Sequence, residues 1–184
     1  MFDNQNFIFH KSGIYSHEGC NHAINFFEKR VDLQHVGESG GGINLEWKRS
    51  TDILLKRCEY TLAEDMLQGC IKDYVRKYPF INQLKPWDLS PTFRIQRYKP
   101  NEGYFLTHCE NMCKDDSERV LSWQIFLNDV KDGGHTVFPS QKRKFRPRRG
   151  DVLMWPAYFT HPHHGESSRS HTKYIMTGWC SFKS

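Results

Sequence analysis

The residues with the clearest chemical potential are His108 and Glu110, which stand two positions apart. In an extended segment, residues i and i+2 point to the same face, so the two side chains are expected to converge on one point. A third ligand from a distant strand would complete one face of an octahedron. Two histidines and one carboxylate in this arrangement suit Fe(II) and leave coordination positions open for other molecules. The pair alone is weak evidence, because chance often produces it in a chain with 10 histidines.

On the residues alone, the third ligand has several candidates. Three histidines lie close together far from the first pair: His161, His163 and His164. Cys109 and Cys113 could instead join His108 in a zinc site. The six cysteines form no CxxC pair, however, which argues against a zinc finger and favours free thiols.

Composition is typical of a soluble globular protein. Hydrophobic residues make up 38% of the chain and aromatic residues 14%, which is too much for a disordered chain. The mean hydropathy is −0.72, and the longest apolar run, residues 152–159, is far shorter than the roughly 18–20 residues of a membrane helix. Residues 1–6 lack the basic and then apolar pattern of a secretory signal. We therefore expect a cytoplasmic protein without a membrane partner.

The net charge of +5 is partly concentrated in one short segment. Six basic residues gather there: Lys142, Arg143, Lys144, Arg146, Arg148 and Arg149. Such a cluster can bind phosphate groups. It is more often the solvated face of a loop or hairpin, and we favour that interpretation while keeping an acidic substrate open.

Two stretches before residue 90 have helical periodicity. Ser16 can cap a helix over about residues 17–30, with Ala23, Ile24 and Phe27 on one face. A second amphipathic helix is predicted from about residue 62 to residue 78, just before Pro79. Between them, the glycine-rich segment 37–42 predicts a flexible loop, and no Gly-Lys-Ser/Thr follows that would make it a phosphate loop.

After Trp87 the pattern changes to short extended segments. Strands are predicted over residues 92–98, 120–127, 135–138, 151–155 and 173–182, with turns at 132–134 and 147–150. Many short strands at fairly regular spacing are typical of a sandwich or barrel. The sequence therefore predicts helices first and then a compact β half, which must position the histidines.

Five ordered motifs in this β half resemble one known family. Residues 98–110 (YKPNEGYFLTHCE) resemble the metal-binding segment of the prolyl 4-hydroxylase-like Fe(II)/2-oxoglutarate-dependent oxygenases. Residues 126–130 (FLNDV) and 133–139 (GGHTVFP) are similar to that family's YLNDV and GGETxFP. Residues 147–156 (PRRGDVLMWP) are similar to its PxxGxxLxF strand, and 163–165 (HHG) with 173–179 (KYIMTGW) to its HxG and KYxxxxW. The resemblance is strong over about residues 90–182 and loose before them, where residues 48–53 look like an upstream strand.

The resemblance implies a role for each matched position. His108, Glu110 and His163 would be the iron ligands, since Lys173 stands ten residues after His163, the family's usual separation. On this reading His161 is a neighbour of the ligands or a surface residue rather than a ligand. The same holds for His164.

The cosubstrate site is also implied by position. Lys173 would pair with the distal carboxylate of 2-oxoglutarate, for which a cation on a flexible stem is suited. Tyr98, ten residues before His108, matches the family tyrosine that hydrogen-bonds the cosubstrate. Thr177 and Trp179 should lie on one face with Lys173, so Thr177 is expected to bind the cosubstrate and Trp179 to line the pocket or pack in the core.

Three positions depart from the family pattern. Glu110 stands where the family usually has aspartate, which keeps the charge and adds a methylene. Phe126 stands where several relatives have a tyrosine that contacts 2-oxoglutarate. His135 replaces the glutamate of the usual GGET turn, and the residues alone offer no functional account of that change.

The resemblance implies a mainly β fold with N-terminal helices (α+β), built around a double-stranded β-helix (jelly-roll, cupin-like) core. We expect one domain over residues 1–184, with about 1–90 as helical support and first strands and about 91–183 as the core. The implied activity is that of a 2-oxoglutarate-dependent dioxygenase, which hydroxylates an unactivated C–H bond and releases succinate and CO2. A peptidyl residue such as proline is the leading target. The compact chain looks like small phage or bacterial members, placed in a bacterial or phage-infected cell.

Two other functions stay open: a metal-binding cupin-like module without turnover, and a nucleic-acid oxidative demethylase. Tyr98 and Lys173 argue against the first, because a simple metal cupin needs neither, and the basic cluster motivates the second. The implied cofactors are Fe(II), 2-oxoglutarate and O2, with ascorbate as a further candidate. A peptide or protein substrate is the expected partner. Segments 38–44, 111–118 and 142–149 are candidate substrate loops, and the oligomeric state is open.

Overall fold

The computed structural model of the protein describes residues 6–40 and 42–183. Residues 1–5, part of the segment that argued against a secretory signal, and Gly41 of the glycine-rich loop lie outside the described residues. Within the described part, no helix is both long and apolar enough to cross a membrane.

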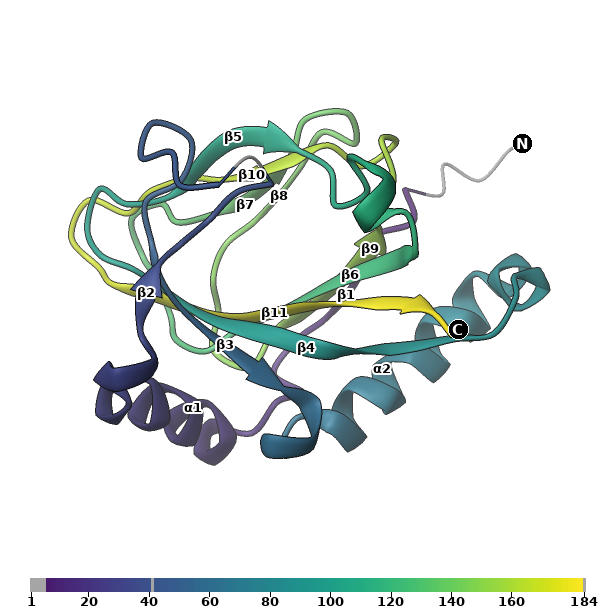
Figure 1. Ribbon diagram of the computed structural model, residues 1–184, viewed down its shortest axis with the longest axis horizontal. Coiled ribbons are helices and arrows are strands. Elements are labelled where there is room, and N and C mark those ends of the chain that lie inside the picture. Colours follow the sequence, from purple (N-terminus) through teal and green to yellow (C-terminus); the bar gives the residue numbers. More distant parts are fainter. Residues whose placement is uncertain (1–5, 41, 184) are drawn as a thin grey trace.

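Two antiparallel sheets face each other in this part of the chain (Figure 1). The larger sheet has the order β1-β9-β6-β11-β4-β3-β2, formed by Phe9–Lys11, Val152–Pro156, Arg119–Phe126, Lys173–Phe182, Trp87–Tyr98, Thr51–Lys56 and His35–Val36. The smaller has the order β5-β10-β7-β8, formed by Tyr104–His108, His163–Gly165, Thr136–Phe138 and Arg143–Phe145. This is the predicted mainly β fold, a double-stranded β-helix supported by N-terminal helices.

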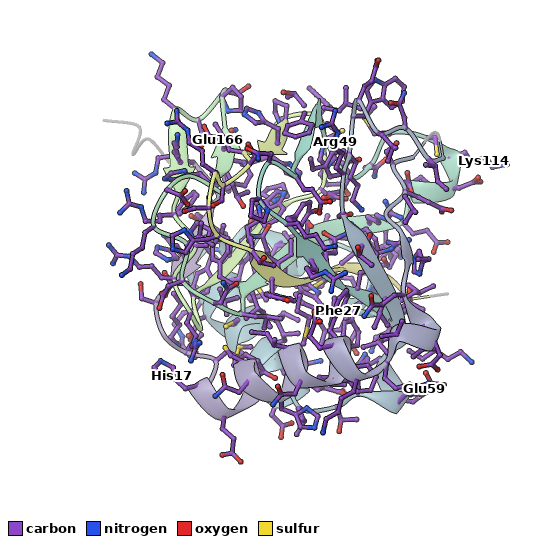
Figure 2. All side chains as sticks on the ribbon, turned by 90° about the vertical axis from the view of Figure 1, so that its left-hand side faces the viewer. His17, Phe27, Arg49, Glu59, Lys114 and Glu166 are labelled. Atoms are coloured by element: carbon purple, nitrogen blue, oxygen red, sulfur yellow. The ribbon has the colours of Figure 1, made fainter. Side chains whose placement is uncertain are left out.

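Two α-helices, α1 (His17–Lys29) and α2 (Glu64–Lys77), cover the outer face of the larger sheet (Figure 1). Short 3-10 helices occupy Val31–Leu33, Arg57–Glu59, Pro79–Gln83 and Lys114–Asp116. The predicted cap of α1 is present, since the Ser16 hydroxyl accepts a hydrogen bond from the N–H of Gly19 at 3.0 Å. A cap of this kind stabilises a helix by about 1 kcal/mol. Phe27 points from α1 into the apolar layer beneath the sheet (Figure 2).

The strands of the larger sheet separate the apolar layer beneath the helices from the cavity between the sheets. Along β4, Phe93 and Ile95 pack toward the helices, while Arg94 and Gln96 line the cavity between the sheets. β11 alternates in the same way, with Met176 in the apolar layer. A period of two is what a strand with two different faces requires. These two central strands therefore carry both the main core and one wall of the cavity.

The predicted elements match the structure closely, with shifts that have physical causes. The strand at 173–182 has the predicted bounds, and α2 begins at Glu64 rather than near residue 62. β3 begins at Thr51, later than residue 48. β4 begins at Trp87, five residues before the predicted start, although it contains Pro91. Pro91 is tolerated because β3 pairs only from Thr92 onward and the register with β11 shifts nearby, so no ladder hydrogen bond is needed there.

Several short strands escaped prediction, namely β1, β2, β8 and β10, each of two or three residues. Segments of two or three residues are too short to show the alternation of apolar and polar residues that predicts a strand. All six cysteines are free, in agreement with the expected thiols.

Candidate metal centre and cosubstrate pocket

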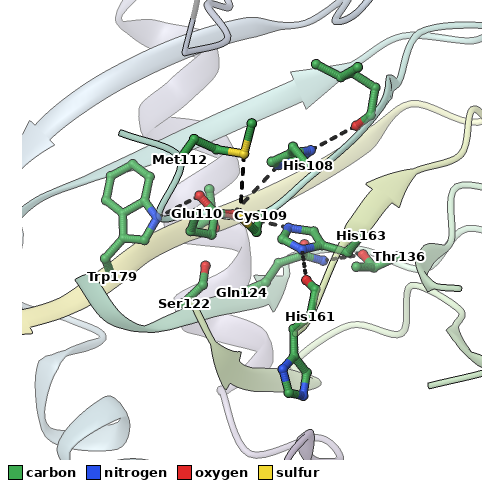
Figure 3. Close-up of polar contacts among 12 residues, drawn as sticks. His108, Cys109, Glu110, Met112, Ser122, Gln124, Thr136, His161, His163 and Trp179 are labelled. Carbon is green, nitrogen blue, oxygen red and sulfur yellow. Dashed lines mark hydrogen bonds and ion pairs between the residues drawn. The ribbon is translucent and has the colours of Figure 1, made fainter. Parts of the chain in front are cut away.

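The residues that could hold a metal come from two neighbouring strands of the smaller sheet. His108 ends β5, His163 begins β10, and the two are direct partners in register. Glu110 lies in a bend just past β5, so it is not the same-face strand neighbour that the spacing predicted. The N–H of Glu110 donates to the carbonyl of Ala157 at 2.9 Å, which fixes this bend. The donor atoms of the three side chains lie within 4.8 Å of one another (Figure 3).

Backbone carbonyls orient both histidine rings. Nδ1 of His108 donates to the carbonyl of Leu106 at 2.9 Å, and Nδ1 of His163 donates to the carbonyl of His161 at 3.0 Å. A carbonyl can only accept, so Nε2 presents a lone pair when a ring is neutral and an N–H when the ring is protonated. These Nε2 atoms lie 3.8 Å and 3.2 Å from Oε1 of Glu110. A cation between them would satisfy acceptor atoms that face one another in this way, so the donor set fits a divalent metal.

The second oxygen of Glu110 is held by an aromatic side chain. The indole Nε1–H of Trp179 donates to Oε2 at 2.8 Å, which leaves Oε1 facing the histidines (Figure 3). The Arg119 guanidinium lies 3.9 Å from the centre of the Trp179 ring and donates to the backbone carbonyl of Glu110 at 2.8 Å. Arg119 is itself fixed by Asp116 at 2.7 Å. The carboxylate is therefore positioned by a chain of contacts that begins on β6 and β11.

The protonation states suit metal binding. Burial opposes ionisation of Glu110, but the hydrogen bond and charge of His163, the charge of His108 and the Trp179 bond outweigh it and hold the pKa of this carboxyl below its ordinary value. Burial, together with the neighbouring His163, lowers the pKa of His108 to about 4. At neutral pH the site therefore presents a carboxylate and a neutral His108 ring.

The competing histidines lie outside this group. The His161 ring is buried against the N-terminal segment, with Nε2 2.9 Å from the carbonyl of Asn6 and Nδ1 2.9 Å from the Thr160 hydroxyl. Only its backbone carbonyl touches the site. His164 points to the other side of β10, where Nδ1 lies 3.3 Å from the Thr107 hydroxyl. The cysteine alternative also finds no support, because the described residues that could share a metal are His108, Glu110 and His163 alone.

Lys173 lies in the same cavity, on β11. The residue is only 3% exposed, and its Nζ donates to the carbonyl of Gly134 at 3.1 Å and lies 4.6 Å from the centre of the Tyr98 ring. Burial lowers the pKa of its ammonium to about 8, although the charge of Glu166 acts in the opposite direction. Among the described residues, no carboxylate is within ion-pair distance of this amine. A buried cation without a counter-ion fits the binding of an anionic ligand such as a carboxylate of 2-oxoglutarate.

Tyr98 is placed beside Lys173 but its hydroxyl is already engaged. The Tyr98 hydroxyl donates to Oε1 of Gln96 at 2.8 Å, and Nε2 of Gln96 donates to Asp52 at 2.9 Å. Asp52 also accepts from Lys48 at 2.7 Å, in an ion pair that is almost fully buried. To donate to a cosubstrate, Tyr98 would have to leave Gln96. In the structure as it stands, the ring of Tyr98 packs against Lys173, and its cosubstrate role stays a prediction.

Thr177 and Trp179 line the cavity on the same face of β11 as Lys173. The Thr177 hydroxyl, however, donates to the carbonyl of Trp123 at 2.8 Å, so its proton is not free for a ligand. Trp179 is the Glu110 partner described above.

The cavity between the sheets has a volume of about 430 Å³. Two of the three predicted substrate segments border it: Glu38, Ser39 and Gly40 come from the first, and Met112, Cys113 and Asp116 from the second. None of its described lining residues comes from the basic cluster at 142–149. There, Lys144 pairs with Glu166 at 2.7 Å on the exposed β7–β8 hairpin, which fits a solvated face.

Some cavity residues were missed by sequence reasoning. Gln124 and Thr136 are buried in the cavity wall and hydrogen-bonded to each other at 3.0 Å. Thr136 lies within the quoted GGHT segment, and the period of the β6 strand could have placed Gln124. Lys48 and Tyr104 lie in the segments 48–53 and 98–110 that drew attention in the sequence, but neither was assigned a role; the centre of the Tyr104 ring lies 3.9 Å from that of His108.

Two further positions that depart from the family pattern, Phe126 and His135, have defined surroundings in the structure. Phe126 is fully buried in the apolar cluster within the sandwich and is not part of the cavity wall. Nδ1 of His135 lies 3.0 Å from Glu166, the same carboxylate that pairs with Lys144. His135 therefore takes part in a polar contact that ties the β7–β8 hairpin to the segment after β10.

The chain is similar to known proteins over its β half and, in fold, over most of its length. Residues 93–181 match the family model described as the 2OG-Fe(II) oxygenase superfamily. A protein named putative prolyl 4-hydroxylase from Acanthamoeba polyphaga mimivirus is 32% identical over 79 residues, covering 38% of this chain and 33% of that protein. A probable prolyl 4-hydroxylase 3 from Arabidopsis thaliana is 24% identical over 176 residues, covering 81% and 57%. The chain thus spans between one third and just over half of the length of these relatives.

Solved structures share the fold. A viral collagen prolyl hydroxylase from Paramecium Bursaria Chlorella virus-1, in complex with 2-oxoglutarate, has a TM-score of 0.72 at 17% identity, covering 96% of this chain and 97% of that one. A prolyl hydroxylase from Trichoplax adhaerens, bound to a peptide fragment of hypoxia inducible factor, has a TM-score of 0.72 at 15% identity, covering 97% and 84%.

Proposed function

We propose that the protein, whose residues 93–181 match the family model of the 2OG-Fe(II) oxygenase superfamily, is an Fe(II)- and 2-oxoglutarate-dependent dioxygenase that hydroxylates a peptidyl residue, with proline the leading target. One observation carries the proposal. The His108, Glu110 and His163 donors and the unpaired, buried Lys173 amine line one cavity. A metal site and a carboxylate site in one cavity are what a metal-binding oxygenase with a dicarboxylate cosubstrate needs.

Each residue has a part in this function. His108, Glu110 and His163 would hold Fe(II), and the backbone carbonyls of Leu106 and His161 would keep both rings aimed at it. Lys173 would bind a carboxylate of 2-oxoglutarate, and the buried wall around it excludes water and strengthens that attraction. When bound, the iron with 2-oxoglutarate and O2 supplies the oxidising power to hydroxylate a C–H bond, with release of succinate and CO2. In this proposal the iron centre carries the reaction, and no described residue is assigned a separate role as acid or base.

A peptide substrate is supported by the cavity mouth and by the relatives. Trp47 and Met112 line the cavity and are 40% and 65% exposed, so apolar surface is open to solvent beside the site. The relatives are named prolyl 4-hydroxylases, and one structural neighbour holds a peptide. Nucleic-acid demethylation has no comparable support, because the basic cluster contributes nothing to the described cavity wall.

The test is an anaerobic titration of metal-free protein with Fe(II) and 2-oxoglutarate, monitored by the visible charge-transfer absorption of the chelate. We expect an absorption band that disappears in His163→Ala and requires at least ten-fold more 2-oxoglutarate in Lys173→Ala. His17→Ala, at the exposed start of α1, and Lys131→Ala, at an exposed lysine that does not line the cavity, are the matched controls and should behave as the parent protein. Iron binding without a band at any 2-oxoglutarate concentration would instead establish a metal-binding module without this cosubstrate.

A further inference from the structure

The cavity holds one cation that the proposed function does not use. Lys48 is neutralised by Asp52 at 2.7 Å, Arg119 by Asp116 at 2.7 Å, and Lys173 is assigned to the cosubstrate. Arg94 also lines the cavity. No carboxylate among the described residues lies within ion-pair distance of its guanidinium.

The position of Arg94 is set by the register of the two central strands. On β4 it shares the cavity face with Gln96 and Tyr98, and across the ladder it is the direct partner of Thr177. Tyr98 is in turn the partner of Lys173. Four residues of strand separate the two pairs, or roughly 13 Å along the sheet. Arg94 therefore lies toward the Trp179 end of the cavity, away from the cosubstrate lysine.

This end of the cavity adjoins the metal ligands. The Arg94 guanidinium lies 5.4 Å from the centre of the Trp179 ring, and that indole is hydrogen-bonded to Glu110.

The contacts that Arg94 makes with other described residues do not satisfy its guanidinium. Contact with an aromatic face attracts the charge but accepts none of its five N–H donors. The other carboxylates of the cavity are committed or remote, since Glu110 belongs to the metal group and Asp116 pairs with Arg119. Glu38 is exposed on the rim segment. Arg97, on the opposite face of the same strand, differs from Arg94 because its charge is neutralised within the protein by Glu28 at 2.9 Å.

We propose that Arg94 binds the carboxylate of an aspartate or glutamate side chain in the peptide substrate, close in sequence to the residue that is hydroxylated. The planar guanidinium fork matches a carboxylate with two parallel hydrogen bonds, which gives direction as well as attraction. An acidic side chain held there would enter the cavity beside Trp179 and the metal ligands. The assignment rests on the proposed oxygenase function and adds the substrate class: acidic peptides.

The test is a selection from a randomised peptide library with a fixed central proline. The protein is loaded with Mn(II), which replaces iron without supporting turnover, and with 2-oxoglutarate, and the bound peptides are sequenced. We expect the wild-type protein to enrich Asp and Glu at a flanking position by about ten-fold or more. Arg94→Met should lose that enrichment, and Arg94→Glu should enrich Lys and Arg instead. Arg97→Met, with the same change of charge on the opposite face of β4, should keep the wild-type preference.

A second measurement separates the two sources of a carboxylate. The affinity of each metal-loaded variant for 2-oxoglutarate is measured without peptide, and thermal unfolding confirms that each variant is folded. An Arg94→Met protein that keeps its 2-oxoglutarate affinity while losing the acidic preference supports the assignment. A ten-fold loss of 2-oxoglutarate affinity, an acidic preference that survives the substitution, or a library without acidic enrichment overturns it. Failure of the wild-type protein to bind 2-oxoglutarate at all would contradict the oxygenase function. This binding measurement contains no peptide, so its result is independent of the peptide selection.

Discussion

The hydrogen bond between Trp179 and Glu110 leads to a quantitative prediction about metal affinity. Glutamate is longer than the aspartate usual in this family, so its carboxylate has more ways to turn away from the histidines. In the structure the indole N–H holds Oε2 at 2.8 Å and leaves Oε1 facing both rings. Trp179→Phe keeps an aromatic ring against Arg119 but removes this donor. We therefore expect the substitution to weaken metal binding without unfolding the protein.

The magnitude follows from the kind of bond that is lost. A hydrogen bond to a charged group contributes about 1.5–3 kcal/mol. Each 1.4 kcal/mol corresponds to a factor of ten in affinity, so the dissociation constant should rise by roughly 10- to 100-fold. The same range is typical when an outer partner of a metal ligand is removed.

The assay is competition of the protein with a chelator for Mn(II) or Co(II), monitored at equilibrium. Trp47→Phe is the matched control, because Trp47 lines the same cavity at its rim without bonding to a ligand. The decisive comparison is the double variant with Glu110→Asp, whose shorter side chain should not reach the indole. In the Glu110→Asp protein, Trp179→Phe should reduce metal affinity only slightly. A dissociation constant within two-fold of the parent, or an equal penalty in both backgrounds, would refute the reasoning.

Further predictions concern Lys173 and the first helix. Burial lowers the pKa of Lys173 to about 8. The affinity for 2-oxoglutarate, measured by calorimetry, should therefore be constant below pH ~8 and fall about ten-fold per pH unit above it, where binding must take up a proton. Lys173→Arg, which stays charged, should flatten this pH profile. The folded-state pKa lies below the ordinary 10.5, so the charged amine destabilises the fold at neutral pH. Lys173→Met should therefore raise the free energy of unfolding at pH 7 by on the order of 2 kcal/mol, with the gain vanishing above pH ~10.5 in urea titrations. Ser16→Ala should lower that free energy by about 1 kcal/mol and leave metal affinity unchanged.

Much of the fold was predictable because its long elements carry strong periodic patterns. The last strand alternates over ten residues from Lys173, and α1 has both a cap and an apolar face. The strands of two or three residues were missed for the opposite reason. β10 is the instructive case, because it holds His163 yet has only three residues, and its place is fixed by pairing with β5 and β7.

The candidate site was predictable in its residue types but not in its contacts. The spacing of His108 and Glu110 predicted convergence, and the side chains do converge, although a bend past β5 and a bond to Ala157 produce it rather than an extended strand. The engagement of Tyr98 with Gln96 could not be read from the sequence, since it depends on a buried chain of hydrogen bonds that reaches Asp52 on β3. Arg94 was missed because an arginine in a strand looks the same whether its partner lies inside the protein or is a ligand.

The two buried lysines of the cavity differ in whether the protein itself supplies a counter-ion. Lys48 and Lys173 are 2% and 3% exposed, so both ammonium groups have lost most of their hydration. Lys48 recovers part of this cost through Asp52, which also accepts from Ser50 and Gln96, so its counter-ion is part of the protein itself. Among the described residues, the Lys173 ammonium contacts a backbone carbonyl and an aromatic face but no carboxylate. The desolvation cost of Lys173 is recovered when an anion binds. At neutral pH, 2-oxoglutarate should therefore raise the free energy of unfolding beyond what the metal alone provides. Lys173→Met should remove this ligand-dependent gain.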